Sequence, residues 1–356
     1  MKRALLLCLL LSFLKTYSQQ YYVVTGKVLD TLQQPLSGAS VFCQNTTVGT
    51  LANAAGEFKL YLPEGGYNLV ISYTGYQTQS LQISNITEFP LTIVLKQIEK
   101  ELAEVVVQNS NEVKNGWEKY GKFFLENFIG TSPNAERCTL QNPESLKFLF
   151  LKKKNKLKIL GKDDLIVMNN ELGYKIHYKL DSFIYEYNTG ISGFFGYPFY
   201  EEIQGSDSLK LVWKQNREKA YYGSRLHFMR SYYDSSLTEE GFMLEIKDTV
   251  SDSDKYLAVS NPYDTSLYVV TDSNTIEIYL PDEVRIIYTK SRADDKFLAT
   301  YKLPKGTPNQ ISAILVNDAF TIEENGFFYP QTALVSTGYW TWKKLADILP
   351  YDYYPD

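Results

Sequence analysis

The chain has 356 residues, a length that favours two domains over one. Its formal net charge of −5, with 22% charged residues, offers no basic surface of the kind that binds nucleic acid, so we expect no nucleic-acid partner. Aromatic residues make up 15% of the chain and include 29 tyrosines, which favour half-buried sheet surfaces and predict a β-rich protein.

Residues 1–18 have the pattern of a secretory signal peptide. Lys2 and Arg3 form a basic start, Ala4 to Leu14 is an apolar run of eleven residues, and Ser18 offers a small residue before a cleavage point at Gln19. This run is too short to span a bilayer, and no later run of eighteen apolar residues follows it. We therefore expect an exported chain without a transmembrane helix.

Residues 22–97 break into short stretches in which apolar and polar side chains alternate, with glycine, proline and asparagine in the turns between them. The turn 53–56 ends on a glycine that can adopt a positive φ at no steric cost, and a second turn follows at 63–66. About seven strands at this spacing predict a small β-sandwich. Side chains that share a strand face include Val24 and Val28, then Phe58, Leu60 and Leu62, then Tyr67, Leu69 and Ile71.

This stretch resembles the carboxypeptidase-regulatory-like, or transthyretin-like, domain. The resemblance rests on GKVLD at 26–30, QPLSGASVF at 34–42 and LPEGGYNLVISYTGY at 62–76. One departure is Asn53, where the family often has Asp, and either residue satisfies the same turn. The module also occurs at the N-terminus of many TonB-dependent outer-membrane receptors. The resemblance therefore implies a protein of the cell envelope, in the periplasm or associated with the outer membrane.

A charged linker is predicted over residues 98–112, and it contains a β-prone run. Val105, Val106 and Val107 are β-branched, so they lose little side-chain entropy when they order in a strand. Similar runs follow this module in TonB-dependent receptors, near the segment that pairs with the energising partner. We predict that residues 101–108 donate a strand, either to the second domain or to another envelope protein.

Residues 113–356 are predicted to form a larger β-rich α+β domain. Its first helix would be capped by Asn115, with Glu118 completing a capping box, and would end at Gly130. Aromatic side chains at helical spacing then indicate a packing face rather than a ligand site. They are Trp117, Tyr120, Phe124 and Phe128.

Most of the remaining chain reads as strands. Examples are SLKFLFL and KLKIL on either side of the turn KKKN, GYKIHYKL, LKLVW at 209–213 and FLATYKL at 297–303. A second helix should begin after Ser224, whose hydroxyl can cap it, and a short one is predicted for KKLADIL at 343–349. This region resembles uncharacterised envelope domains that follow the same sandwich, through NPESLKF, LGYKIHYKL, REKAYYGSRLHFMRS and LPYDYYP.

Motifs for catalysis are missing. A catalytic zinc takes three protein ligands and prefers histidine, but the chain has only His177 and His227, and no H-E-x-x-H. A serine-hydrolase elbow and a phosphate-binding loop are also absent. We predict no metal, no cofactor and no catalytic residue. Acidic pairs such as Glu201-Glu202 are expected in solvated turns, although a glycosidase could pair carboxylates in space.

The densest polar and aromatic stretch, WKQNREKAYYGSRLHFMRSYY, offers candidates for ligand binding. Guanidinium groups match carboxylates and phosphates, so several of its side chains could converge on an anionic ligand. The structural alternative is a capped helix with its arginines in solvent and a buried, hydrogen-bonded histidine. The candidates are Arg217, Tyr221, Arg225, His227 and Arg230.

Two further features have a structural and a functional interpretation. Lys152, Lys153 and Lys154 could contact anionic lipid, or they could form a solvated hairpin tip. Cys43 and Cys138 remain after removal of the leader, and an exported compartment permits a disulfide. Because the two cysteines fall in different modules, we expect two buried free thiols.

Taken together, these patterns predict a mainly β protein, a transthyretin-like sandwich followed by a larger β-rich α+β domain. The predicted role is non-catalytic binding or scaffolding in the periplasm or at the outer membrane. One alternative is a secreted hydrolase with its site in the second domain. The other is a small outer-membrane β-barrel built from residues 135–350, which the short strands and interrupting helices disfavour.

Overall fold

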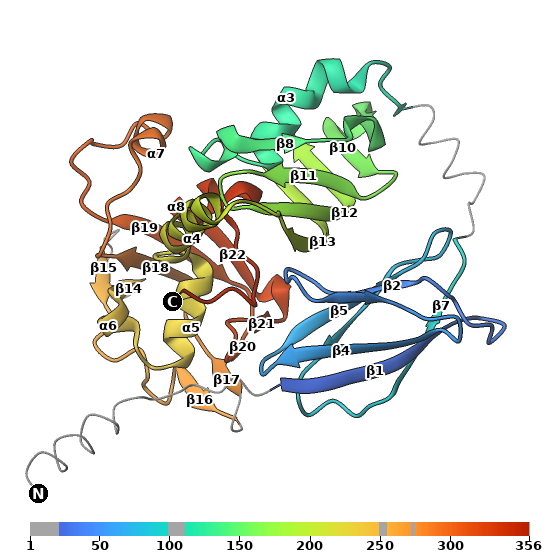
Figure 1. The fold of residues 1–356 in the computed structure, drawn as a ribbon. Coiled ribbons are helices and arrows are strands. Elements are labelled where there is room, and N and C mark those ends of the chain that lie inside the picture. The colour runs from blue at the N-terminus through green and yellow to red at the C-terminus, as the bar shows by residue number, and fades with distance from the viewer. Residues whose placement is uncertain (1–20, 99–110, 249–254, 272–274, 356) are drawn as a thin grey trace, which may run out of the picture.

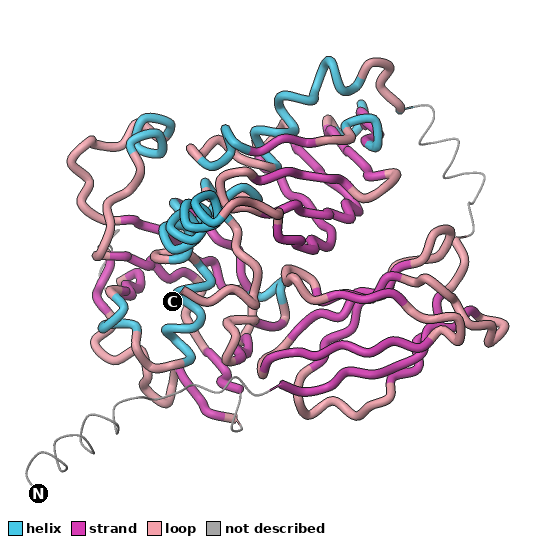
Figure 2. Tube along the Cα trace, viewed as in Figure 1, coloured by secondary structure: helices cyan, strands magenta, loops and turns pink. Residues whose placement is uncertain are grey.

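The computed structural model describes residues 21–98, 111–248, 255–271 and 275–355. Strands dominate these residues, and the few helices lie mainly in the second half of the chain (Figures 1 and 2). The predicted fold class, mainly β with an N-terminal sandwich, is confirmed. The predicted strand donor, Val105 to Val107, lies outside the described residues.

The N-terminal sandwich consists of two facing sheets. One has the order β4-β1-β7 and the other β3-β2-β5-β6. The strand faces predicted from alternation point into one core, where Val24, Leu62 and Ile71 are fully buried. The strands are β1 (Tyr21–Asp30), β2 (Ser40–Cys43), β3 (Gly49–Leu51), β4 (Glu57–Pro63), β5 (Tyr67–Ser72), β6 (Gln79–Ile83) and β7 (Leu91–Leu95).

Turn chemistry in the sandwich follows the sequence prediction. Gly56 has a φ of +77°, and the Asn53 side-chain oxygen accepts hydrogen bonds from the backbone N–H groups of Ala55 and Glu57, both at 2.9 Å. Gly26 is required for a different reason, because a Cβ there would lie 2.6 Å from the ring of buried Phe58. Local turns and one close contact thus explain part of the glycine pattern.

The next unit is a six-stranded antiparallel sheet covered by helix α3 (Figure 1). Its long strand β12 pairs along one edge with β13 and along the other with β11 and β10. The elements are α3 (Gly116–Phe128), η1 (Asn134–Arg137), β8 (Cys138–Leu140), η2 (Pro143–Ser145), β9 (Leu146–Leu151), η3 (Lys152–Lys154), β10 (Lys156–Gly161), β11 (Leu165–Asn169), β12 (Tyr174–Glu186) and β13 (Ile191–Glu202).

The last unit combines a five-stranded and a four-stranded sheet, and helix α5 packs into the core that they share. Residues 113–355 therefore contain separate hydrophobic cores. The elements are α4 (Asp207–Tyr221), α5 (Arg225–Tyr233), α6 (Leu237–Glu240), β14 (Phe242–Lys247), β15 (Tyr256–Ala258), β16 (Tyr268–Val270), β17 (Thr275–Ile278), β18 (Glu283–Tyr288), α7 (Asp295–Thr300), β19 (Gln310–Val316), β20 (Phe320–Glu323), β21 (Phe328–Tyr329), η4 (Gln331–Ala333), β22 (Leu334–Gly338), α8 (Tyr339–Trp342) and η5 (Leu345–Asp347).

The first helix keeps its predicted packing face but not its predicted cap. Phe124 and Phe128 are fully buried, and the N–H of Gly130, with a φ of +115°, donates to the carbonyl of Leu125 at the helix end. Asn115 adopts a left-handed conformation and its side chain makes no capping hydrogen bond, so the predicted capping box is wrong. The Asn115 backbone turns the chain into the helix instead.

Two predicted strands are helices. LKLVW lies in α4, which the Ser206 hydroxyl caps by accepting from the Leu209 N–H, and Trp213 is buried with its Nε1 donating to the Asn170 carbonyl at 2.9 Å. FLATYKL overlaps α7, which the Asp294 carboxylate caps by accepting from the Lys296 N–H at 2.8 Å. In both segments capping and tertiary packing outweigh the strand preference of apolar residues.

The helix predicted at 343–349 is displaced, and strand β13 was not predicted. The helical turn α8 ends at Trp342, Lys343 is extended, and a 3₁₀ turn follows at Leu345–Asp347. Strand β13 contains residues that usually interrupt strands, namely Gly193, Gly196 and Pro198. A proline is tolerated there because β12 is the one partner of β13 among the strands that the structure describes, and proline is found on such edges.

Candidate functional site

The sandwich joins the six-stranded sheet through the loop between β2 and β3. The Asn45 N–H donates to the Pro198 carbonyl at 2.7 Å, and the Tyr200 N–H donates to the Thr46 carbonyl at 2.9 Å. The Gln44 side-chain amide also donates to the Gly196 carbonyl at 3.2 Å. The loop therefore uses the free edge of β13 much as an added strand would.

The chain end closes the same junction. The Tyr351 N–H donates to the Asn45 carbonyl at 2.7 Å, and the Asp352 carboxylate accepts from both the N–H and the hydroxyl of Thr47. Burial raises the pKa of Asp352, and the hydrogen bonds from Thr47 oppose that shift. The C-terminal segment, residues 343–355, thus connects the sandwich to the rest of the chain.

Arg230, a candidate from the sequence, is buried at the centre of this junction. Its Nη1 and Nη2 donate to the carbonyls of Tyr353 and Tyr351, both at 2.8 Å, and its Nε donates to the Asn325 carbonyl at 3.1 Å. The Asn325 side-chain amide in turn donates to the Gly66 carbonyl at 2.9 Å. Arg230 therefore binds backbone of this chain, and it does not face solvent as the structural alternative had it.

Arg217 is similarly occupied. Its Nε donates to the Leu172 carbonyl at 2.7 Å, Nη1 binds the Glu202 carboxylate at 2.6 Å, and the guanidinium lies 3.9 Å from the centre of the Tyr174 ring. Arg217 lines a hollow of about 310 Å³, and the other charged residues that line it are Lys214, Glu202 and Asp352. The charges in this hollow balance, so it does not favour an anionic ligand.

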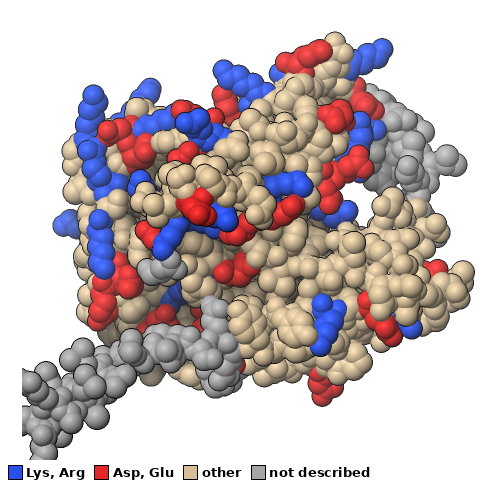
Figure 3. All heavy atoms as spheres, in the orientation of Figure 1, with Lys and Arg blue, Asp and Glu red and all other residues tan. Residues whose placement is uncertain are grey.

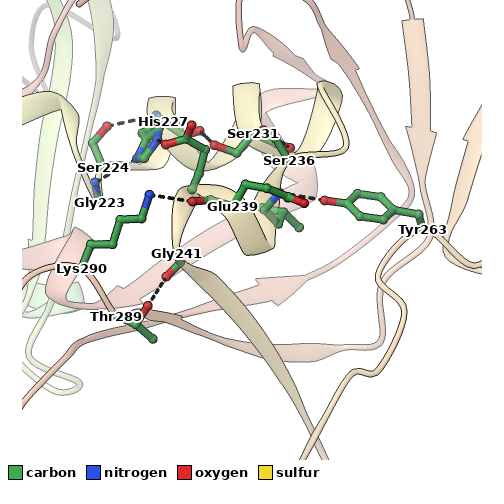
Figure 4. Close-up of polar contacts among 12 residues, drawn as sticks. Gly223, Ser224, His227, Ser231, Ser236, Glu239, Gly241, Tyr263, Thr289 and Lys290 are labelled. Atoms are coloured by element: carbon green, nitrogen blue, oxygen red, sulfur yellow. Dashed lines mark hydrogen bonds and ion pairs between the residues drawn. The ribbon is translucent and has the colours of Figure 1, made fainter.

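His227 is a buried structural residue (Figure 4). Its Nδ1 accepts a hydrogen bond from the Gly223 N–H at 3.1 Å, so the proton of the neutral ring lies on Nε2, which contacts the Glu240 carboxylate at 3.1 Å. Burial lowers the pKa of His227, and Glu240 opposes that shift. Nearby, Lys290 donates to the Glu239 carbonyl, so α6 is anchored beside the histidine.

Tyr221 packs between His227 and the chain end. Its ring lies 4.9 Å from that of His227 and 6.1 Å from that of Tyr353, measured between ring centres. Burial raises the pKa of Tyr221, and Arg230 partly offsets this effect. The hydroxyl is therefore protonated at neutral pH, and the ring serves as a packing element.

Arg225 alone among the five candidates lines a cavity between the later units of the chain. This cavity has a volume of about 440 Å³ and lies where the α4–α5 turn, β13, β22 and the C-terminal segment meet. The Arg225 guanidinium lies 5.3 Å from the centre of the Phe328 ring, and its Nη1 is 3.5 Å from the Ser336 hydroxyl. Both of these neighbours also line the cavity.

The cavity is also lined by cations that no sequence pattern indicated. Lys343 pairs with the Asp347 carboxylate at 3.1 Å, whereas Lys219 and Lys344 have no acidic partner among the described residues. Burial lowers the pKa of Lys344. The double lysine at 343–344 was visible in the sequence, but only the folded chain end brings it to Arg225. We take this cavity as the candidate site.

Remaining candidates lie elsewhere. Lys152, Lys153 and Lys154 form the exposed tip of the β9–β10 hairpin. In Figure 3 the visible face mixes positive and negative side chains over the later units, while the sandwich shows few charges. Lipid contact by the hairpin stays a prediction.

Cys43 and Cys138 are free thiols, but only Cys43 is buried as expected, and Cys138 is partly exposed. Cys43 is fully buried in the sandwich, and burial raises the pKa of Cys138 to about 12. His177 contacts the Glu201 carboxylate at 3.0 Å. Within the described ranges no group of three His, Cys, Asp or Glu side chains is placed to hold a metal ion, and the absence of a metal stays a prediction. None of the helices described there is long and apolar enough to cross a membrane.

Comparisons with known proteins concern mainly the sandwich. Residues 24–107 match the model of the CarboxypepD_reg-like domain. The TonB-dependent receptor SusC of Bacteroides thetaiotaomicron is 36% identical over 95 residues, which are 27% of this chain and 9% of SusC. The chain thus spans only a small part of this relative.

Solved structures with local similarity include two dioxygenases. The 3-chlorocatechol 1,2-dioxygenase of Rhodococcus opacus 1CP is 10% identical, with 24% of this chain and 62% of that chain covered. The catechol 1,2-dioxygenase of Pseudomonas arvilla C-1 is 12% identical, with 25% and 56% covered. Both TM-scores are 0.20, so neither likeness carries an argument about fold or activity. The N-terminal sandwich is a CarboxypepD_reg-like domain, related to the corresponding segment of a TonB-dependent receptor.

Proposed function

We propose that the chain is an exported, non-catalytic binding protein of the periplasm or outer membrane, and that the 440 Å³ cavity is its ligand site. The observation that carries this proposal is the position of the cavity, at the point where helices, sheets and chain end meet. Small-molecule sites are typically clefts of about 300–1,000 Å³ that combine apolar walls with a few polar groups. The relationship of the sandwich to SusC supports an envelope location.

The wall chemistry suits binding better than turnover. Apolar contact surface comes from Leu226, Met229 and Trp340, while its one acidic residue, Asp347, is held by three donors. The Asp347 carboxylate accepts from Ser132 at 2.6 Å and from Asn134 at 2.9 Å, besides its contact with Lys343. A carboxylate so occupied has little capacity to act as a general acid or base.

A cavity-filling substitution tests the proposal. A Cβ added at Gly193, which lines the cavity, meets no atom within 4 Å, so Gly193→Trp should fill the space without disturbing packed neighbours. Gly306 is equally open but does not line the cavity, so Gly306→Trp is the matched control. The measurement is mass spectrometry of small molecules released on denaturing protein purified from the envelope fraction.

We expect a ligand to accompany the natural chain and the Gly306→Trp variant but not Gly193→Trp. Equal ligand recovery from all three proteins would contradict a site in the cavity. Hydrolysis of generic ester, glycoside or peptide substrates, abolished by Gly193→Trp, would instead support the hydrolase alternative.

A partner protein is part of the same proposal. We also propose that residues 101–108 donate a strand to an envelope protein. Proline at Val106 would remove a backbone donor and should weaken such pairing. If Val106→Pro lowers the melting temperature, the strand pairs within this chain. If stability is unchanged but a partner captured from envelope extract is lost, the strand pairs between chains. No change in either measurement would make the segment a passive linker.

A further inference from the structure

The charges around the cavity do not cancel. Its lining includes four cationic side chains, Lys219, Arg225, Lys343 and Lys344, and a single carboxylate, that of Asp347. Because Asp347 is paired with Lys343, the other three cations have no acidic side chain within ion-pair distance in the described part of the chain. Among the residues that the structure describes, the Arg225 side chain contacts the Ser336 hydroxyl, at 3.5 Å, and the face of the Phe328 ring. Lys219 is exposed, but Arg225 and Lys344 are partly buried. Partly buried cations normally have a counter-charge, so these two leave room for one from a ligand.

We infer that the cavity binds a small organic anion, a carboxylate or a phosphate ester, that also carries hydroxyl groups. This inference rests on the proposed function and adds the chemical class of the ligand. Arg225 and Lys344 would bind the acidic group, since a guanidinium offers two parallel donors to a carboxylate or phosphate and an ammonium offers a compact charge.

The start of helix α5 contributes to the same preference. Ser224, Arg225 and Leu226 all line the cavity, and the Ser224 hydroxyl is already used in accepting from the His227 N–H. First-turn N–H groups have no acceptor within a helix, and the helix dipole favours negative charge at this end. The N-terminus of α5 therefore adds positive potential beside the Arg225 side chain.

The requirement for hydroxyl groups comes from Gln310. This residue is 9% exposed and lines the cavity, and no donor in the described ranges of the chain bonds to its Oε1. Its Nε2 donates to the Arg292 carbonyl at 3.4 Å, which orients the amide and leaves the oxygen as the free group. A buried acceptor without a donor is costly, and a ligand hydroxyl would satisfy it.

Isothermal titration calorimetry on the chain from residue 19 onward tests the inference. The probes are glucose 6-phosphate, glucuronate, glucose and phenyl phosphate, which separate a phosphate ester from a carboxylate and a charged sugar from a neutral one. The variants are Arg225→Gln and Lys344→Gln, with Lys153→Gln, on the exposed hairpin tip, as the matched control.

We expect at least one charged sugar to bind and glucose not to bind. Each cavity variant should weaken that binding by about 10-fold or more, the usual size of a hydrogen bond to a charged group, and Lys153→Gln should leave it unchanged. Affinity should also fall between low and high salt. Gln310→Met should reduce the advantage of glucose 6-phosphate over phenyl phosphate, because only the sugar offers hydroxyl donors.

Two outcomes separate this inference from the proposed function. If a ligand is blocked by Gly193→Trp but unaffected by Arg225→Gln and Lys344→Gln, the cavity binds a neutral molecule and the anion inference is wrong. If charged probes bind equally well to Gly193→Trp, the site is elsewhere and the proposed function fails as well. Circular dichroism of each variant checks that the fold is retained before binding is compared.

Discussion

The sandwich and the region that follows it build their cores over different distances in sequence. Every buried member of the sandwich core lies between Val24 and Leu95. The core of the six-stranded sheet extends from Phe124 to Leu349, because Leu345, Ala346 and Leu349 return from the chain end to pack against it. The sandwich is therefore closed by local elements, whereas the second region is completed only when the end of the chain docks.

The C-terminal segment links the stability of the second region to the candidate site. The C-terminal segment contributes to a hydrophobic core, contacts the sandwich and lines the cavity. A single stretch of chain thus couples the integrity of the second region to the candidate site. If the comparison is correct, perturbing the chain end should damage the later units and spare the sandwich, and the reverse should hold for a sandwich substitution.

The largest expected effect follows from removing residues 345–356. The truncation deletes two buried leucines and the Asp347 carboxylate that binds Ser132 and Asn134. Each buried leucine alone is worth about 2–5 kcal/mol, so the loss approaches the whole stability of a typical domain, about 5–15 kcal/mol. Limited proteolysis with mass spectrometry should show cleavage throughout 113–344 and a protected sandwich. Removal of residues 355–356 alone is the control.

Phe58→Ala should have the opposite pattern. Phe58 is 5% exposed beneath Gly26, and truncating a buried phenylalanine costs about 3–5 kcal/mol. A domain of this size has a thin stability margin, so we expect the sandwich to become protease-sensitive while the later units stay protected. Lys59→Ala, exposed on the same strand, should behave like the natural chain. Melting of Phe58→Ala at the natural temperature would show that Phe58 is not part of the core.

Arg230→Met should lower the free energy of unfolding by about 3 kcal/mol. Three backbone carbonyls lose a charged donor, and each loss is worth about 1–3 kcal/mol before water relieves part of it. The measurement is denaturant unfolding, read separately from the sandwich and the later units. Arg225→Met, on the same helix without backbone acceptors, serves as the control. Equal destabilisation by both variants would mean that Arg230 does not act through the chain end.

Gly66→Ala should have a smaller effect at the contact between the sandwich and the β20–β21 turn. A Cβ at this position would lie 2.7 Å from side-chain atoms of Glu323 and Phe327. Overpacking of this kind typically costs about 1–3 kcal/mol. Gly306→Ala, in open space, is the matched control. Thermal unfolding should show a lower melting temperature for Gly66→Ala alone, and equal melting of both variants would argue against a tight contact.

The smallest effect concerns pH. Because burial lowers the pKa of His227, the unfolded chain binds a proton at this residue more readily than the folded chain does. The associated stability is fully present above the ordinary histidine pKa of about 6.5 and is lost as the pH falls from there through the folded-state value. Denaturant unfolding from pH 7.5 to 5 should show this loss, and His227→Gln should flatten it. A slope unchanged by His227→Gln would assign the pH dependence to other groups.

Local physics accounts for the parts that sequence patterns predicted correctly. Alternation at Phe58, Leu60 and Leu62 marks a buried strand face, Gly56 marks a turn, and Ser224 marks a helix start; all three hold in the structure. The two segments wrongly predicted as strands share one cause. LKLVW and FLATYKL are apolar enough for strands. In both segments a helix-capping residue and buried side chains stabilise a helix instead.

Alternation and turn chemistry act between residues close together along the chain, so the sandwich, its turns and its family resemblance could be predicted from the sequence. It also indicated Arg225 as a binding residue, although without distinguishing it from Arg217 and Arg230. Tertiary contacts distinguish the three arginines, since backbone carbonyls of Leu172, Asn325 and Tyr351 accept hydrogen bonds from Arg217 and Arg230. The cavity likewise depends on tertiary structure, because its lining combines Arg225 with Lys344 from the chain end. The three arginine contacts join residues 45, 95 and 121 positions apart, and no local pattern records them.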